Sequence, residues 1–81
     1  MNDIKFDYSR LKWAMLKAGL TQEALARKAG ISKTSLNLKL QNKRYFSQAE
    51  ITAIEKALDL KKLDAQFDNT PYSLDKYFFA I

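Results

Sequence analysis

The chain has 81 residues, no Cys, no His and a net charge of +5 at pH 7. A chain of this length forms one domain with a small core. The absence of Cys and His removes disulfides, thiolate metal sites and the commonest general base. We therefore expect no enzyme activity, metal, cofactor or small-molecule ligand. No apolar run reaches about 20 residues, the length of a membrane span, and the N-terminus lacks a signal-peptide pattern, so a cytoplasmic location is predicted.

The positive charge is concentrated in one part of the chain. Residues 10–44 hold nine Lys or Arg and one acid (Glu23), whereas residues 45–81 hold four Lys and six acids. Such asymmetry is typical of a protein with one face that meets a polyanion. A solvated basic face without a partner gives the same pattern, so charge alone leaves nucleic-acid binding open.

One local pattern occurs four times: an apolar residue, a capping residue, and a second apolar residue four positions after the cap. The capping side chain can accept a hydrogen bond from a free N–H of the first helical turn, and the apolar pair can pack as a hydrophobic staple. The pattern predicts helices over 8–18, 22–28, 33–41 and 48–58 and thus an all-α fold. The capping residues are Asp7, Thr21, Ser32 and Ser47, and Ser47 forms a capping box with Glu50.

The helical spacing also predicts the core and the helix ends. Gly19 and Gly30 follow the first two helices, where a C-terminal glycine can adopt a positive φ. The predicted inward residues are Leu11, Met15, Ala18, Leu25, Ala26, Ala29, Leu36, Leu40, Ile51, Ile54 and Leu58.

The chain is predicted to be a single domain, residues 1–81, with a core of residues 7–60 and a C-terminal extension of residues 61–81. In the extension, KKLDAQF can add a helical turn, and DNTPYS is a turn or a helix start with Thr70 as cap and Pro71 at the first helical position. The last residues, YFFAI, either pack over the helical core or form a subunit interface. Their composition leaves helix and strand both open.

The segment around Gly30 carries a family resemblance. A short loop there requires a sharp crossing of two helices, and Ala24, Ala26 and Ala29 are small enough for the helix axes to approach. With the strings TQEALA and AGIS, residues 8–60 resemble the helix-turn-helix of the temperate-phage repressor and Cro family. The resemblance implies a lambda-repressor-like DNA-binding domain in a compact bundle of four or five helices. LDKYFF is similar to small Cro-like proteins of Gram-positive phages or prophages, which implies a bacterial host cell.

The third predicted helix supplies the candidate base-reading residues. With Leu36 and Leu40 inward, a rotation of about 100° per residue places Thr34, Asn37, Leu38 and Gln41 on the outer side. Lys33 can donate to guanine and Asn37 can pair with adenine, while methyl groups of Thr34 or Leu38 can touch thymine. For Leu38, local packing and contact with a partner protein stay open as alternatives.

Other residues nearby are candidate contacts to the DNA backbone. The resemblance implies that Gln22 contacts a phosphate. Asn42 stands where the family commonly has Gly, and Asn is among the residues best able to replace it at a positive φ. Trp13 and Tyr45 are interpreted as packing or rim residues rather than stacking platforms. The further predicted phosphate contacts are Ser32, Ser35, Lys39, Gln41, Lys43 and Arg44.

Together these features predict a sequence-specific regulator that binds double-stranded DNA. A Cro-like repressor that acts by occupying an operator is favoured, because no ligand domain is visible in the sequence. One domain offers few phosphate contacts, so a homodimer is expected on half-sites about 34 Å apart, with the C-terminal region as its interface. The main alternative is a protein-interaction module, an antitoxin or anti-repressor, for which Leu38 and YFFAI are the motive. RNA binding is disfavoured because no aromatic platform is visible.

Overall fold

A computed structural model describes residues 5–67 and 70–81. Within these residues the secondary structure is entirely helical, so the predicted all-α fold is confirmed. The first four helices lie where the capping pattern places them, and two short helices follow. The elements are α1 (Ser9–Ala18), α2 (Gln22–Ala29), α3 (Lys33–Leu40), α4 (Gln48–Leu58), α5 (Leu60–Ala65) and α6 (Asp75–Phe78).

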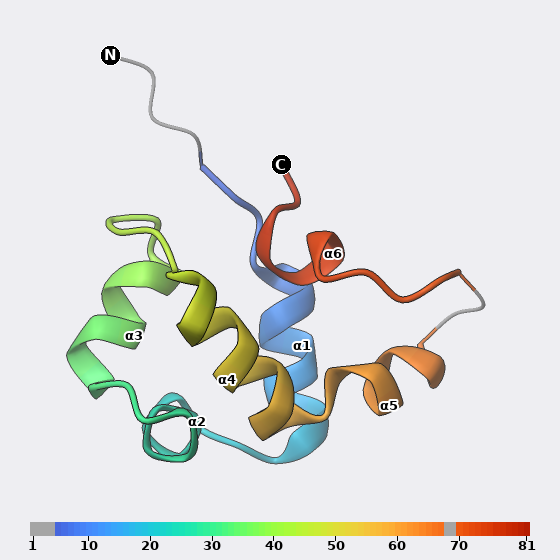
Figure 1. Cartoon of the computed structure of the whole chain (residues 1–81), viewed down its shortest axis with the longest axis horizontal. Helices are drawn as coiled ribbons and strands as arrows, with labels where there is room; N and C mark the ends of the chain where they lie inside the picture. The colour runs from blue at the N-terminus through green and yellow to red at the C-terminus, as the bar shows by residue number, and fades with distance from the viewer. Residues whose placement is uncertain (1–4, 68–69) are drawn as a thin grey trace.

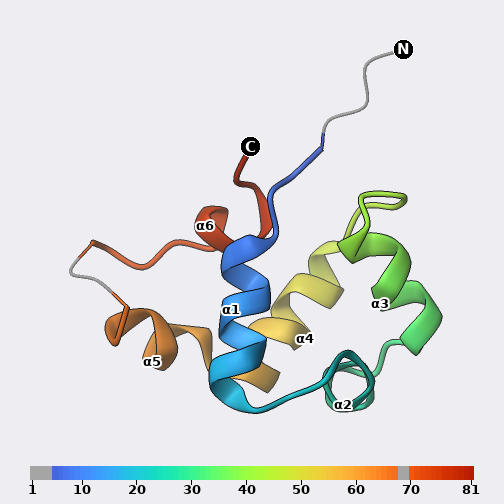
Figure 2. The same cartoon turned by 180° about the vertical axis from the view of Figure 1, so that it is seen from behind.

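The helices form a bundle in which α1 and α4 occupy the middle (Figure 1). Helix α3 lies at one margin of the bundle and α5 at the other, and the reverse view shows the same order (Figure 2). In Figure 1, α2 is seen almost along its axis while α3 runs across the view, so the two helices cross steeply. The fold therefore places α3 at the periphery, with only one side against the bundle.

Local capping explains why three of these helices begin where they do. In each, the predicted capping side chain accepts a hydrogen bond from the backbone N–H of the third helical residue. The Ser47 cap is reciprocal, because the Glu50 carboxylate also accepts from the Ser47 N–H at 2.8 Å, as a capping box requires. The donor–acceptor pairs are Ala24–Thr21 at 3.1 Å, Ser35–Ser32 at 3.0 Å and Glu50–Ser47 at 3.1 Å.

The start of α1 differs from the prediction by one residue. Tyr8 occupies the N-cap position and makes no side-chain capping bond. The Asp7 carboxylate instead accepts from the Ser9 backbone N–H at 2.9 Å, so it still satisfies a donor of the first turn. The buried Tyr8 side chain explains the shift, because it belongs to the apolar core.

Four of the described residues have a positive φ, and all four lie at helix ends or in turns. Gly19 (φ 71°) and Gly30 (φ 73°) end α1 and α2 as predicted, and Asn42 adopts φ 63° after α3. Asp59 (φ 53°) joins α4 directly to α5, a corner that no glycine signals. Asp is one of the few residues that enter the left-handed region readily, which allows the abrupt change of direction.

The aromatic end of the chain packs over the helices. Tyr77 and Phe78 are fully buried in the core, while Phe79 and Ile81 stay exposed. Burial of a side chain of this size contributes about 1.5–3 kcal/mol, which favours packing over exposure. Tyr77 and Phe78 lie in α6, which begins at Asp75 and ends at Phe78. Of the two alternatives for DNTPYS, the helix start with Thr70 as cap and Pro71 in the first turn is therefore wrong, which leaves the turn; the neighbouring Asp68 and Asn69 lie outside the described residues.

A buried carboxylate ties the C-terminal region to the bundle. Asp64 on α5 is 2% exposed and accepts hydrogen bonds from the Tyr77 hydroxyl at 2.6 Å, Arg10 at 3.2 Å and Lys76 at 3.2 Å. Burial by itself raises the pKa of Asp64, but these three donors together lower it below its usual value. Burial and the bond to Asp64 raise the pKa of Tyr77 to about 12. The ionised carboxylate thus links α1, α5 and α6.

None of the described helices combines the length and apolar character that crossing a membrane would need.

Candidate nucleic-acid interface

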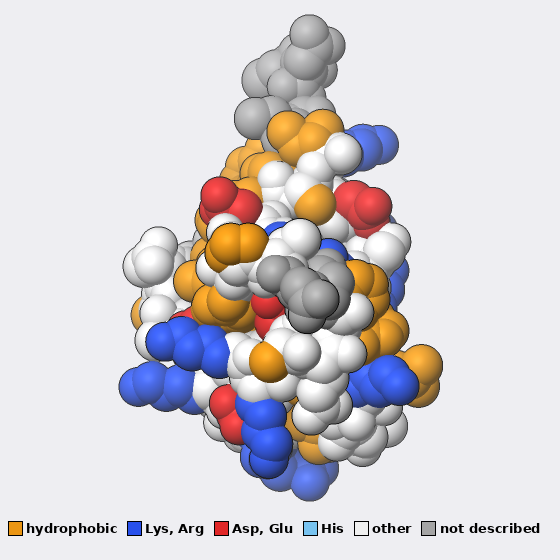
Figure 3. Space-filling model, turned by 90° about the vertical axis from the view of Figure 1, so that its right-hand side faces the viewer, with side chains coloured by type: hydrophobic (Ala, Val, Ile, Leu, Met, Phe, Trp, Pro, Cys, Tyr) orange, Lys and Arg blue, Asp and Glu red, His pale blue; other side chains and the backbone are white. Residues whose placement is uncertain are grey.

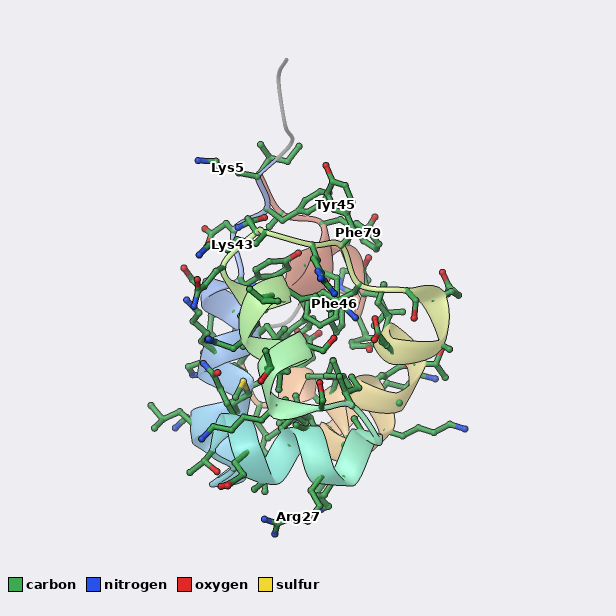
Figure 4. The ribbon with its side chains drawn as sticks, turned by 90° about the vertical axis from the view of Figure 1, so that its left-hand side faces the viewer. Lys5, Arg27, Lys43, Tyr45, Phe46 and Phe79 are labelled. Atoms are coloured by element: carbon green, nitrogen blue, oxygen red, sulfur yellow. The ribbon has the colours of Figure 1, made fainter. Side chains whose placement is uncertain are left out.

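The exposed side of α3 is set by two buried leucines on its other side. Leu36 is fully buried and Leu40 nearly so, which anchors the helix against the bundle. Their burial leaves Lys33, Thr34 and Asn37 exposed on the outer side. The rotation argument from the sequence therefore gives the correct orientation, and α3 faces the viewer in Figure 4.

Leu38 is less exposed than the other three candidate base-reading residues. It is half-buried, whereas the other three are exposed. Part of its side chain is therefore occupied by local packing, and the rest remains open to a partner. Thymine contact and protein contact both remain compatible with this placement.

The candidate phosphate contacts lie on α2, on α3 and in the turn after α3. Gln22 is the first residue of α2 and is half-buried. The Ser32 oxygen accepts the capping bond, but its O–H can still donate. Ser35 is half-buried in the first turn of α3. The remaining exposed candidates are Gln41, Lys43 and Arg44.

Lys39 does not join this group. It is only 8% exposed, and its ammonium forms an ion pair with the Glu50 carboxylate on α4. Lys39 is therefore left out of the phosphate contacts proposed below, because the structure gives its charge an internal partner. The rotation argument could not reveal this pairing, since Glu50 lies on a different helix.

Glu50 makes one interaction within the start of α4 and one with α3. Its carboxylate completes the capping box with Ser47 and also binds Lys39. Partial burial raises the pKa of Glu50, but the bonds from Lys39 and Ser47 outweigh burial and lower it. The carboxylate therefore stays ionised at neutral pH, and it stabilises the angle at which α3 is presented.

The turn after α3 contains a contact that sequence analysis missed. The Asn42 side chain accepts from the Phe6 backbone N–H at 2.8 Å and donates to the Phe6 carbonyl at 2.9 Å. The two residues are 36 positions apart. The positive φ was anticipated at Asn42, but no local signal indicates the partner of its amide.

The distribution of charge distinguishes the α3 side from the rest of the surface. No Asp or Glu occurs between Glu23 and Glu50, so α3 and the following turn contribute cations and no acid of their own. On the face around α5, acidic and basic side chains alternate (Figure 3). Trp13 belongs to that second region and packs edge-to-face on Phe67, with ring centroids 4.7 Å apart. This contact confirms its interpretation as a packing residue.

Two comparisons with known proteins bear on these observations. A family model described as "Helix-turn-helix" matches residues 11–65, about two thirds of the chain and all of α2, α3 and α4. The search of curated proteins found no match. The matched segment contains the steep α2–α3 crossing and the exposed outer side of α3.

Proposed function

The chain belongs to the helix-turn-helix family of Cro/C1-type DNA-binding regulators, and from that premise we propose that it is a Cro-like repressor of a phage or prophage. That family comprises DNA-binding regulator domains and is not a class of enzymes. In the proposed mechanism α3 occupies the major groove of an operator and excludes polymerase or a competing regulator. A cytoplasmic location in a bacterial host is part of the same proposal.

The outer face of α3 is the observation that supports this proposal. A helix fits the major groove of B-form DNA, where each base pair presents a distinct pattern of donors and acceptors. Lys33, Thr34 and Asn37 offer a cation, a methyl with a hydroxyl, and a carboxamide on one exposed face. These side chains can discriminate between base pairs, and the lack of any Asp or Glu from residue 24 to residue 49 favours approach to DNA. We therefore retain them as proposed base-reading residues, with Leu38 as a flanking apolar contact.

The proposed backbone contacts surround this face. Lys43 and Arg44 supply basic side chains in the turn after α3, and the start of α3 offers hydroxyls. Contacts of this kind fix the register of a protein on the duplex without reading sequence. The set consists of Gln22, Ser32, Ser35, Gln41, Lys43 and Arg44.

We also propose that two copies bind together. A single domain makes few phosphate contacts, so tight binding calls for a homodimer on half-sites about 34 Å apart. Phe79 and Ile81 remain exposed after the rest of the aromatic end is buried. At the very end of the chain, these two side chains stay available to a second copy.

The decisive experiment is selection of bound sites from a random duplex pool with the full chain. We expect a short enriched sequence arranged as an inverted repeat, because two-fold protein symmetry is mirrored in the operator. Binding of the winning duplex should then be measured against its single strands and a scrambled duplex. No enrichment, or equal affinity for single strands, would remove the repressor proposal and favour a protein partner or RNA.

A further inference from the structure

The N-terminal segment is joined to the turn after α3 by a bidentate contact. Asn42 pairs with both the N–H and the carbonyl of Phe6, in the way one strand pairs with another. Glycine alone would satisfy a positive φ at this position. The carboxamide therefore adds something that the turn itself does not require, namely a fixed path for the chain at Phe6.

Two further contacts restrain the same segment. The Asp7 backbone N–H donates to the Ala80 carbonyl at 2.6 Å. The Phe6 ring packs edge-on against Tyr45 and Phe79, with ring centroids 6.1 and 5.6 Å apart. Phe6 is thus held on its backbone by Asn42, and on its side chain by Tyr45 from the same α3–α4 connection and by Phe79 from the C-terminal end.

This anchoring determines where Lys5 lies. Lys5 is exposed, and among the residues the structure describes no ion pair to it is found. It immediately precedes Phe6, and Lys43 immediately follows Asn42, the residue that bonds Phe6. Figure 4 shows Lys5 and Lys43 at the same end of the molecule, away from Arg27 on α2. Three exposed cations, Lys5, Lys43 and Arg44, therefore flank a single turn.

We propose that Lys5 is a DNA-phosphate contact and that Asn42 is the positioning residue that holds it beside Lys43 and Arg44. The proposal rests on the function proposed above, since it assumes that the adjacent face of α3 meets DNA. Duplex DNA presents a closely spaced row of phosphates, so cations on both sides of one turn can contact neighbouring phosphates. Anchoring Phe6 lowers the conformational entropy that Lys5 loses on binding.

The test measures the salt dependence of binding for the wild type, Lys5→Ala, Asn42→Gly and the double variant. The probes are the duplex from site selection and a random duplex. Asn42→Gly keeps a residue that accepts the positive φ but removes the clamp, and Lys62→Ala on α5 serves as the control. Thermal melting of each variant establishes that it is folded at the temperature of the binding assay.

Lys5→Ala should make the negative slope of log K against log salt shallower by about 0.9 on both duplexes, as expected for one lost phosphate contact. The Lys62→Ala slope should equal that of the wild type. In the Asn42→Gly background, the effect of Lys5→Ala on the slope should be less than about half of its effect in the wild-type background, because the two residues are coupled. That coupling would not arise from a purely structural role of Asn42.

Three outcomes would count against the proposal. An unchanged slope for Lys5→Ala would remove Lys5 from the interface, and an equal Lys5 effect in both backgrounds would remove the positioning role of Asn42. In either case wild-type binding to the selected duplex would leave the repressor proposal intact. A wild-type chain that binds no duplex would overturn both proposals together.

Discussion

The α2–α3 unit and the α5–α6 region are stabilised by different kinds of contact. In the first, each capping side chain accepts a hydrogen bond from the backbone N–H three residues further along the chain, and Gly30 makes the turn. In the second, Asp64 binds Arg10, a residue 54 positions distant, together with Tyr77 and Lys76. The caps and the turn of the α2–α3 unit are thus local, with the Lys39–Glu50 pair joining α3 to α4, whereas the scaffold beneath it depends on a buried long-range network.

This difference separates two expected phenotypes. Substitutions in the Asp64 network should change stability while leaving the DNA preference of the folded protein intact. Substitutions on the outer face of α3 should change binding while leaving stability almost unchanged, because exposed positions outside special features alter it by about 0.5 kcal/mol or less.

The largest effect is expected for Asp64→Ala. The substitution removes the buried carboxylate that the Arg10 and Lys76 side chains each contact at 3.2 Å, and removing one partner of a buried ion pair costs about 3–5 kcal/mol. Urea unfolding would measure the loss, with Asp75→Ala, an exposed acid on α6, as the control. Equal stability of the two variants would contradict the structural role of the network.

Acid titration gives an independent measure of the same network. The folded-state pKa of Asp64 lies below the unfolded value of about 3.9, so its contribution is present above that pH and is lost as pH falls further. Wild-type stability should therefore decrease below about pH 4. The decrease should be shallower in Asp64→Ala, and an unchanged pH profile would show that other carboxylates account for it.

The next largest effect concerns the α3 face. Thr34→Ala or Asn37→Ala should each weaken binding to the selected operator by about 1–3 kcal/mol and binding to random duplex very little. The reason is that a lost base contact affects only the sequence it reads. Gel-shift titrations on both duplexes would measure this, and equal losses on the two would exclude base reading by these side chains.

Gly30→Val tests the turn on which the α2–α3 crossing depends. At φ 73°, an added Cβ would meet no heavy atom within 4 Å, so any cost arises from the left-handed backbone itself. We expect a loss of about 1–2 kcal/mol and a smaller loss for Gly30→Asn. Thermal melting checks the order, and an unchanged melting temperature for Gly30→Val would contradict the backbone conformation.

The smallest effect distinguishes two lysines of the same segment. Lys43→Ala should make the salt dependence of DNA binding shallower, by about one in slope, on every sequence. The reason is that Lys43 is exposed and can reach a phosphate. Lys39→Ala should leave the slope unchanged and lower the melting temperature, because it strands the partly buried Glu50. Identical behaviour of the two variants would overturn the separation of their roles.

The sequence by itself determined the elements whose signals are local. Capping residues, apolar spacing and Gly30 placed α1 to α4, and the burial of Leu36 and Leu40 gave the correct outer face of α3. These signals suffice because a helix is specified by contacts within one or two turns. The same logic identified the Ser47–Glu50 capping box and the positive φ of Asn42.

Only the tertiary structure decided which polar side chains are used within the fold. It assigned Lys39 to Glu50, clamped Phe6 to Asn42, and buried Asp64 among three donors. It also settled that Tyr77 and Phe78 pack over the core in a helix. Each of these outcomes depends on residues brought together from distant parts of the chain, and neither periodicity nor spacing along the sequence records which of them meet.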